Sequence, residues 1–243
     1  MRNPRIYQAT ELELDKEIAL DDQGANHIGN VLRMQPGQPL IVFNGQGGEF
    51  QCEIIAANKK NVSIRALGFS SDNRQSTLHT HLGQVISRGD RMDYALQKAV
   101  ELGVSEITPL FSMRCEVKLT GARLDKKRQQ WEHLVISACE QSGLNIIPKL
   151  NHPVPANEWF SQTEGSFKWL LHPGETPLHN LLSDEKPASI CLAIGPEGGF
   201  EPQEIEHANQ SGFQAVAIGP RVLRTETAPV AALSLLQYQW GDY

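Results

Sequence analysis

Two glycine-rich segments in the C-terminal half of the chain combine residue types that could do chemistry. Residues 192–200 (LAIGPEGGF) are an apolar run that leads into a glycine-proline loop with Glu197 in its middle. Residues 219–228 (GPRVLRTETA) place Arg221, Arg224 and Glu226 directly before an apolar run of helical length. Glycine and proline allow a backbone to approach a ligand closely and to hold a non-helical turn. Both segments are therefore candidate ligand loops.

The first loop lacks the features of a phosphate-binding loop. No lysine follows its glycines as in a P-loop, and the spacing Gly-x-Gly-x-x-Gly of dinucleotide sites is absent. The carboxylate of Glu197 would also repel a phosphate in a partly dry pocket. A neutral or cationic adenosine-type ligand, bound by backbone amides and carbonyls, fits the loop better. A tight structural turn is the alternative for a single loop, but residues 172–174 (HPG) and 219–224 supply two more, which favours ligand binding.

The second loop indicates an anionic partner. Its polar side chains meet at the expected N-terminus of a helix, where free N–H groups and the helix dipole favour negative charge. A capping box with Thr225 as N-cap would explain Thr225 and Glu226, but it would not explain Arg221 and Arg224. Two arginines at this position predict that an RNA phosphate, or a base that becomes anionic, is held there.

Other charged residues stand at the ends of further expected elements. Arg88 follows the first strand of the C-terminal half and Arg114 follows the second, so both are candidates for substrate contact or for a solvated surface. Glu140 and Gln141 close a long helix and could present polar groups nearby, although a helix end needs polar residues in any case.

Alternating strands and helices must position these loops. Short, nearly continuous apolar runs such as 189–194 are typical of strands buried on both faces of a parallel sheet. The expected strands are 78–86, 106–111, 167–171, 189–194 and 213–218, and the expected helices are 91–102, 125–142, 202–210 and 228–240. This alternation predicts an α/β fold with a mostly parallel sheet, in which ligands bind outside the carboxyl ends of the strands.

The N-terminal part of the chain has a different pattern. Short β-like pieces are separated by Asn-Gly, Gly-Gly and Asn-Lys-Lys turns, and one helix is expected at 25–33. We therefore predict a small β barrel for residues 1–70, a polar linker for 71–77 and the α/β domain for 78–243.

Outside the acidic segment 11–22, basic residues outnumber acidic ones in the N-terminal domain. This excess predicts an RNA-facing surface, or else a basic face that is only solvated. The candidates for RNA contact there are Arg2, Arg5, Arg33, Lys59 and Lys60.

Composition limits the other classes of function. The 243 residues, 40% of them hydrophobic, can build one large or two small globular domains. The net charge of −6 argues against sequence-blind binding of nucleic acid. The four cysteines lack metal spacing, and for His79 and His81 a packed or surface pair is favoured over a metal site, so we predict no metal. No apolar run has the length of a membrane span, and the first residues lack the apolar core of a signal peptide; we expect a cytoplasmic protein without membrane association.

Four ordered motifs together resemble the ribosomal RNA small subunit methyltransferase E family of the SPOUT superfamily. The motifs are residues 88–104 (RGDRMDYALQKAVELGV), 138–143 (ACEQSG), 194–199 (IGPEGG) and 219–228 (GPRVLRTETA). The likeness extends over essentially the whole chain, including residues 27–34 (HIGNVLRM).

The resemblance implies a fold and an activity. The fold would be an N-terminal PUA-like barrel followed by a SPOUT domain with a trefoil knot, and the protein would form a homodimer. The activity would be transfer of a methyl group from S-adenosylmethionine to N3 of one uridine, position 1498 in the standard numbering, of 16S rRNA, with the RNA or the small ribosomal subunit as partner.

For this activity we assign roles to residues by their types and their places in the expected loops. The catalytic residues would be Arg221, Arg224 and Glu226, with an arginine stabilising the anionic base and the glutamate accepting or relaying its proton. The cofactor would be bound by Leu171, His172, Pro173, Ile194, Gly195, Pro196, Glu197, Gly198, Gly199, Ile218, Gly219, Val222, Leu223 and Thr227. The substrate RNA would be contacted by Arg2, Arg5, Arg33, Arg88, Arg114, Glu140 and Gln141.

One segment departs from the family pattern. Members often continue the second motif with Arg-Asn-Arg-Val-Pro, whereas this chain has aliphatic Leu144 and Ile146 in place of the two arginines. If the segment touches RNA, that contact is weaker here or carried elsewhere. Two rival functions stay open: a methyltransferase of the same fold that acts on another RNA site, and a non-catalytic RNA-binding assembly factor.

Overall fold

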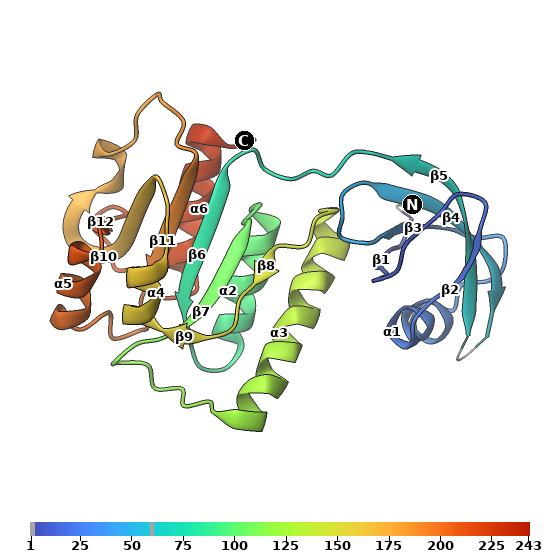
Figure 1. The fold of residues 1–243 in the computed structure, drawn as a ribbon, viewed down its shortest axis with the longest axis horizontal. Helices are drawn as coiled ribbons and strands as arrows, with labels where there is room; N and C mark the ends of the chain where they lie inside the picture. The colour runs from blue at the N-terminus through green and yellow to red at the C-terminus, as the bar shows by residue number, and fades with distance from the viewer. Residues whose placement is uncertain (1–2, 59–60) are drawn as a thin grey trace. The chain divides into compact units, whose positions relative to one another are not determined.

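The computed structural model describes residues 3–58 and 61–243, and their contacts divide the chain into two compact units (Figure 1). The first unit comprises Met1–Gln75 and Cys139–Ile147, and the second comprises Ser76–Ala138 and Pro148–Tyr243. The chain first passes between the units close to the expected linker. The return of Cys139–Ile147 to the first unit was not expected, because its local pattern is that of a helix end in the α/β part.

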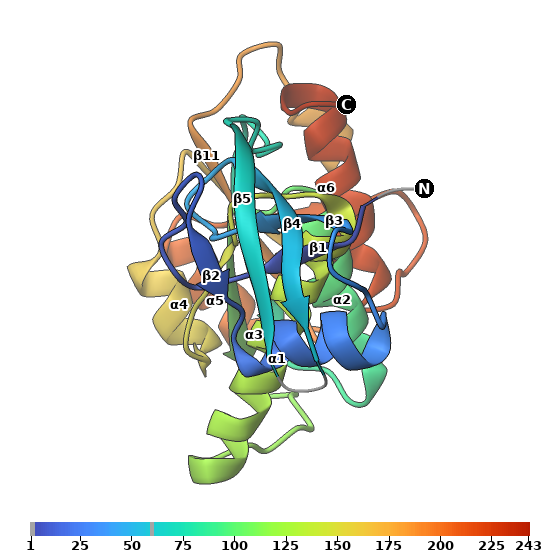
Figure 2. The same ribbon diagram turned by 90° about the vertical axis from the view of Figure 1, so that its right-hand side faces the viewer.

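The first unit is built on a mixed five-stranded sheet. Its strands pair in the order β1-β3-β4-β5-β2; β1 and β3 are parallel and the remaining neighbours are antiparallel. The strands are β1 (Arg5–Tyr7), β2 (Glu17–Ala19), β3 (Pro39–Phe43), β4 (Glu49–Ala57) and β5 (Val62–Ser70). Figure 2 shows β3, β4 and β5 beside one another, with α1 across one end. The sequence predicted a small β barrel for residues 1–70; the expected strands are present, and they pair as one five-stranded sheet.

The helical segment of this unit starts earlier than expected. It consists of α1 (Asp22–Asn26), which continues directly into a π-helical turn, η1 (His27–Val31). The Asp21 carboxylate caps α1 by accepting the Gly24 N–H at 2.7 Å. Ile28 is fully buried in the core between this segment and the sheet.

The second unit contains a seven-stranded sheet in which every recorded strand pair is parallel. The order is β12-β10-β11-β6-β7-β8, and β9 also pairs with β7. The strands are β6 (His79–Val85), β7 (Glu106–Phe111), β8 (Lys149–Leu150), β9 (Val154–Pro155), β10 (Phe167–Pro177), β11 (Ser189–Ile194) and β12 (Gln214–Ala217). Their parallel arrangement brings the carboxyl ends of β10, β11 and β12 to one edge of the sheet, as the α/β prediction required.

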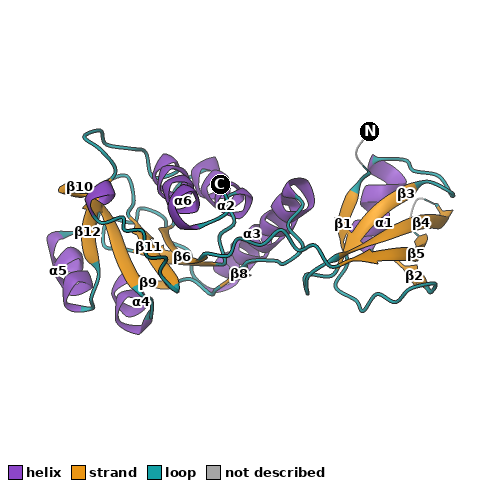
Figure 3. Cartoon of the chain, turned by 90° about the horizontal axis from the view of Figure 1, so that it is seen from above, coloured by secondary structure: helices purple, strands orange, loops and turns teal. Residues whose placement is uncertain are grey.

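Helices cover both faces of this sheet: α2 and α6 lie on one face, and α4 and α5 on the other (Figure 3). The helices are α2 (Asp90–Glu101), α3 (Gly121–Ser142), α4 (Ala156–Gln162), α5 (Pro202–Gln210) and α6 (Thr227–Trp240), with a 3₁₀ turn η2 (Leu178–Asn180). Helix α5 has the predicted bounds because its start is specified locally: Pro202 occupies the first turn, and Glu201 and Glu204 form a reciprocal capping box.

Two predictions about the second unit need correction. The expected loop at 172–174 lies within β10, which continues to Pro177 after a register shift that follows Leu171. Helix α3 begins at Gly121 rather than at residue 125. In the final helix, Ala232, Leu236 and Trp240 are buried, whereas Leu235 is 39% exposed.

Candidate functional site

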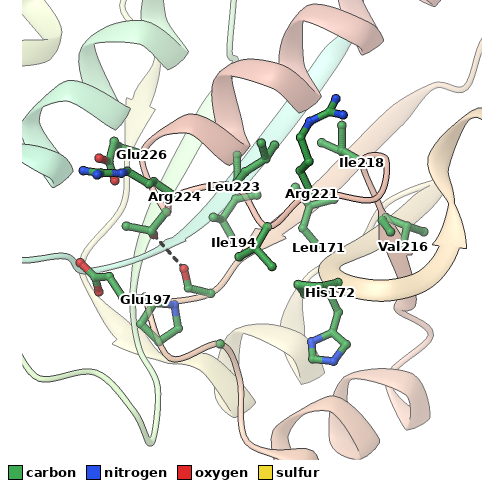
Figure 4. Close-up of a pocket in the computed structure, with 18 of the residues that line it drawn as sticks. Leu171, His172, Ile194, Glu197, Val216, Ile218, Arg221, Leu223, Arg224 and Glu226 are labelled. Carbon is green, nitrogen blue, oxygen red and sulfur yellow. Dashed lines mark hydrogen bonds between the residues drawn. The ribbon is translucent and has the colours of Figure 1, made fainter.

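A cavity of about 420 Å³ lies at the carboxyl ends of β10, β11 and β12 (Figure 4). It is lined by residues 171–173 of β10, by residues 194–197 and 199 at the end of β11 and beyond it, by residues 216–219, 221–226 and 228 at the end of β12 and beyond it, and by Arg91. Its volume falls in the range of about 300–1000 Å³ that is typical of small-molecule sites. The three glycine-containing segments singled out from the sequence therefore enclose one site.

The walls of the cavity are largely aliphatic. Figure 4 shows Leu171, Ile194, Val216, Ile218 and Leu223 around its centre, contributed by all three strand ends. Side chains of this kind hold the apolar faces of a ligand, while exposed backbone groups provide direction.

The polar side of the cavity carries two carboxylates. Glu197 forms an ion pair with Arg91 at the start of α2, and this hydrogen-bonded partner raises the pKa of the Arg91 guanidinium, with a smaller contribution from the nearby charge of Glu226. The charge of Glu197 is thus partly neutralised. Glu197 would therefore repel a phosphate less than its charge alone predicts, although the loop still lacks a phosphate-binding motif.

One carboxylate oxygen of Glu226 has no hydrogen-bond partner among the described residues. This oxygen, the Oε2 atom, is buried. The residue stands at the N-cap of α6, yet its side chain makes no capping hydrogen bond. A buried carboxylate oxygen of this kind is costly unless a ligand group completes it, so Glu226 is a candidate for direct chemistry.

Thr225 fixes the chain where it crosses the strand ends. Its hydroxyl donates to the carbonyl of Gly195 at 2.8 Å and accepts the side-chain N–H of Gln84, in β6, at 3.1 Å. Both side chains are buried. The segment that leaves β12 at the edge of the sheet is thereby fastened to β11 and β6. Thr225 is therefore not the N-cap of α6, which corrects the capping interpretation.

The two arginines of the second loop point in different directions. Figure 4 shows the Arg224 guanidinium on the side of the cavity where Glu226 lies, whereas that of Arg221 points away from Glu226. Both side chains are exposed, and neither has an ion pair in the described part of the chain. Of the two arginines, Arg224 is therefore the one placed beside Glu226.

Two expected cofactor residues lie outside the cavity lining. Gly198 presents its carbonyl to Arg114, whose guanidinium donates to it at 2.6 Å and pairs with Glu201 at 2.8 Å. Thr227 is exposed in the first turn of α6. Arg114, expected to contact substrate, thus braces the glycine loop. The other expected cofactor residues line the cavity.

In the first unit, two expected RNA contacts are engaged in internal structure. Arg5 is 8% exposed and pairs with Glu49 and with the Asn145 side chain. Glu140 accepts the Tyr7 N–H at 2.9 Å, and burial raises the pKa of its carboxyl. Arg5 therefore stabilises this unit and is not available to RNA in this conformation.

Three of the other expected RNA contacts, Arg33, Arg88 and Gln141, are exposed. Arg33 is exposed and has a positive φ of 53°, and Gln141 is exposed on the last turn of α3. Arg2, Lys59 and Lys60 lie outside the described residues. Arg88 is exposed after β6, where it pairs with Glu116.

Sequence reasoning missed several cavity residues. They are Arg91, Val216, Ala217, Thr225 and Ala228. Arg91 lies within one of the recognised motifs and could have been assigned as the partner of an acidic loop. The partners of Thr225 could not have been found locally, because Gln84 and Gly195 are distant in sequence.

No cluster of three or more His, Cys, Asp or Glu side chains suited to a metal ion occurs within residues 3–58 and 61–243. Over the same residues, no helix combines the length and apolar character needed to cross a membrane.

Comparison with protein families gives two matches. A model described as an RNA methyltransferase domain matches residues 74–237, and one described as an RNA methyltransferase PUA domain matches residues 20–67. The "Ribosomal RNA small subunit methyltransferase E" of Buchnera aphidicola subsp. Schizaphis graminum is 41% identical over 242 residues, which cover 99% of this chain and 98% of that protein. The protein of the same name from Bacillus subtilis is 28% identical and covers 94% and 93%, respectively.

Two solved structures are similar over the full length of both chains. A putative methyltransferase from Legionella pneumophila in complex with the bound cofactor SAM is 41% identical, with a TM-score of 0.96 and 100% coverage of each chain. A ribosomal RNA small subunit methyltransferase E from Neisseria gonorrhoeae bound to S-adenosyl methionine is 36% identical, with a TM-score of 0.92 and the same coverage.

Proposed function

The chain belongs to the ribosomal RNA small subunit methyltransferase E family, and from this membership we propose that it methylates N3 of one uridine of 16S rRNA, using S-adenosylmethionine. The observation that carries the proposal is the cavity at the strand ends, where a buried, unpartnered oxygen of Glu226 lies in a site with Arg224 at its rim. Membership implies the RNA methyltransferase class and, by resemblance, the choice of N3; Glu226 and Arg224 are residue types suited to methylation of an imide nitrogen.

The residues of the cavity fit the cofactor. Aliphatic side chains such as Leu171, Ile194 and Leu223 would enclose its apolar parts, and the backbone of the glycine loop would bind the adenosine portion. The carboxylate of Glu226 favours a ligand that carries positive charge, and its buried Oε2 atom has no hydrogen-bond partner among the described residues. When bound, the cofactor supplies an electrophilic methyl group on a sulfonium.

The protein must make a weakly acidic nitrogen nucleophilic. N3 of uridine carries an imide proton, and its removal spreads negative charge onto the two adjacent carbonyl oxygens. We assign proton acceptance to Glu226, because its buried oxygen has a lone pair that no protein donor occupies. We assign stabilisation of the anionic base to Arg224, whose exposed guanidinium has no ion pair among the described residues. The low polarity of the aliphatic walls strengthens both interactions.

Single-turnover methyl transfer tests these roles. At saturating RNA and cofactor, Glu226→Gln is expected to lower the rate by about 10²- to 10⁴-fold, because the amide cannot accept the proton. Arg224→Ala is expected to lower it by about 10²- to 10³-fold through loss of one charge-stabilising group. Arg221→Ala should lower the rate far less than Arg224→Ala, since its guanidinium points away from Glu226. Rates near wild type for both Glu226→Gln and Arg224→Ala would refute the assignment.

The two rival functions give different results in one experiment. Mass spectrometry of small-subunit RNA from a strain without the gene should show loss of one 3-methyluridine, restored by the wild-type gene. Loss of a different modified nucleotide would favour another RNA site. An unchanged set of modifications, with no cofactor binding in calorimetry, would favour a non-catalytic assembly factor.

We further propose that the protein is cytoplasmic and that its N-terminal unit contributes to RNA binding. The proposed knot forms where residues 218–226 cross the strand ends. We also propose that the protein is a homodimer. Exposed apolar side chains on α2 and α6 support the dimer: Tyr94 is 45% exposed, Leu235 39% and Tyr238 75%. Light scattering after gel filtration tests it; a monomer mass over the micromolar range would contradict the dimer.

A further inference from the structure

A basic groove lies outside the cavity, in the second unit. It is formed by the loop after β6, the start of α2, the segment before α3 and the first turns of α3. Its charged lining residues are Arg88, Asp90, Asp93, Arg123, Lys126 and Lys127. The buried ring of Trp131 contributes to the same groove.

Four cations and two carboxylates line this groove; of the carboxylates, Asp90 is exposed and Asp93 is paired. The Asp93 carboxylate accepts the Lys127 ammonium at 3.0 Å and the Trp131 indole N–H at 3.1 Å. Arg123 and Lys126 are exposed, and no ion pair involves either of them in the part of the chain that the structure describes. They stand three residues apart on α3, so their side chains project from neighbouring positions of one helix face. The groove therefore presents two free cations to solvent.

Arg88 adds a third, weakly held cation. Its ion pair with Glu116 has a distance of 3.0 Å, but both side chains are about two-thirds exposed, at 66% and 63%. An exposed pair of this kind is held only weakly, so a phosphate can replace the carboxylate.

A second hollow connects the groove to the cavity. It shares Arg88, Gly89 and Asp90 with the groove, and it shares Arg91 and Glu197 with the cavity. The hollow therefore adjoins the cavity at Arg91 and Glu197 and adjoins the groove at Arg88. The groove is positioned to hold whatever chain is attached to a base placed in the site.

We propose that this groove binds the backbone phosphates of the substrate RNA next to the methylated nucleotide, with Arg123 and Lys126 as the main contacts. The proposal rests on the proposed function. The groove offers cations rather than exposed aromatic rings, because Trp131 is buried; its contribution is therefore affinity and register, not recognition of bases. A local site of this kind also explains how a chain with a net charge of −6 can hold RNA at all.

The test compares two double variants of the full-length protein with equal changes in net charge. Arg123→Gln/Lys126→Gln removes the two groove cations. Arg128→Gln/Lys186→Gln is the matched control: Arg128 pairs with Glu132 on the same helix, Lys186 donates to the Thr77 hydroxyl, and neither lines the groove. The probe is a synthetic RNA with the sequence of the 16S rRNA region that the enzyme methylates.

Binding is measured as a function of salt. Each phosphate contact contributes about 0.7–0.9 to the slope of log affinity against log salt, so loss of two contacts should make the slope shallower by about 1.4–1.8. The same release of counterions predicts about 15- to 30-fold weaker RNA binding by the groove variant at 150 mM salt. The control variant should stay within about twofold of wild type.

Kinetics separate this proposal from the proposed function. The groove variant should show a raised KM for RNA, an unchanged kcat at saturating RNA and unchanged affinity for S-adenosylmethionine in calorimetry. The proposed role of the groove would be refuted if the groove variant had the RNA affinity and salt slope of wild type, or if the control variant lost as much affinity. This result would leave the proposed function intact, because the wild-type protein would still methylate RNA. Absence of any methylation by the wild-type protein would instead refute the proposed function.

Discussion

Thr225→Val removes one hydroxyl at the point where the chain crosses the strand ends, and it preserves the shape of the side chain. The hydroxyl is the hydrogen-bond partner of both the Gly195 carbonyl, at 2.8 Å, and the Gln84 side-chain N–H, at 3.1 Å. Thr225 is 5% exposed and Gln84 is 0% exposed, so water cannot replace the lost partner. In the variant the buried Gly195 carbonyl loses this donor, and the buried Gln84 side-chain N–H loses one of its acceptors.

The expected cost follows from these two groups. A buried polar group that loses its partner costs about 1–3 kcal/mol. The Gln84 amide keeps a second acceptor, the Val85 carbonyl at 3.2 Å, so its share lies near the lower limit. The free energy of unfolding should fall by about 2–4 kcal/mol. For domains of about 150–250 residues this lowers Tm by about 2–4 °C per kcal/mol, or about 4–16 °C in all.

Urea unfolding and calorimetric binding of S-adenosylmethionine give the two readouts. Thr225→Ser retains the hydroxyl and serves as the control, with a much smaller loss of stability. Because the same hydroxyl holds Gly195 in the loop that lines the cavity, Thr225→Val should also weaken cofactor binding. The role given to Thr225 would be refuted if the free energy of unfolding of Thr225→Val lay within about 0.5 kcal/mol of wild type and the variant bound the cofactor equally well.

Three further predictions concern buried groups away from the cavity. Burial lowers the pKa of His81 from 6.5 to about 4, so the unfolded chain binds more protons than the folded chain between these pH values. The free energy of unfolding should therefore fall by about 3 kcal/mol between pH 6.5 and pH 4. Urea unfolding as a function of pH measures this fall, and His81→Asn should make it smaller. Gly83→Ala would place a Cβ 2.6 Å from the ring of Trp159 and should lower the free energy of unfolding by about 1–3 kcal/mol, measured by thermal unfolding. A glycine-to-alanine change in an exposed loop should cause a smaller loss. Arg5→Met leaves the buried carboxylate of Glu49 without its main cation and should lower the free energy of unfolding by about 3–5 kcal/mol. The double variant Arg5→Met/Glu49→Met also removes the carboxylate and should be more stable than Arg5→Met alone. If it is not, the uncompensated charge of Glu49 does not explain the loss.

Elements whose limits depend on nearby residues were predicted closely. Strand β11 and helix α5 have the predicted bounds, because an unbroken apolar run specifies the first, and Pro202 with the Glu201–Glu204 capping box specifies the second. Short elements gave no such signal. Helix α4 has seven residues, and the burial of Trp159 and Phe160 against the sheet stabilises it more than its own propensity can.

The candidate site was predicted as three loops, but its internal connections were not. Parallel strands with similar apolar runs do not reveal their order, and the order β12-β10-β11-β6 determines which loops become neighbours. The pairing of Glu197 with Arg91, the position of Thr225 on Gly195 and the different directions of Arg221 and Arg224 all depend on that order.

The sequence by itself determined the α/β class, the ligand side of the sheet and the residue types of the site, since periodicity, glycine-proline loops and charge act over a few neighbouring positions. Only the tertiary structure decided that Arg5 is buried against Glu49, that Cys139–Ile147 belongs to the first unit, and that Glu226 retains a buried oxygen without a partner among the described residues. The physical reason is that burial and pairing are set by contacts between segments far apart in the chain, which no local pattern encodes.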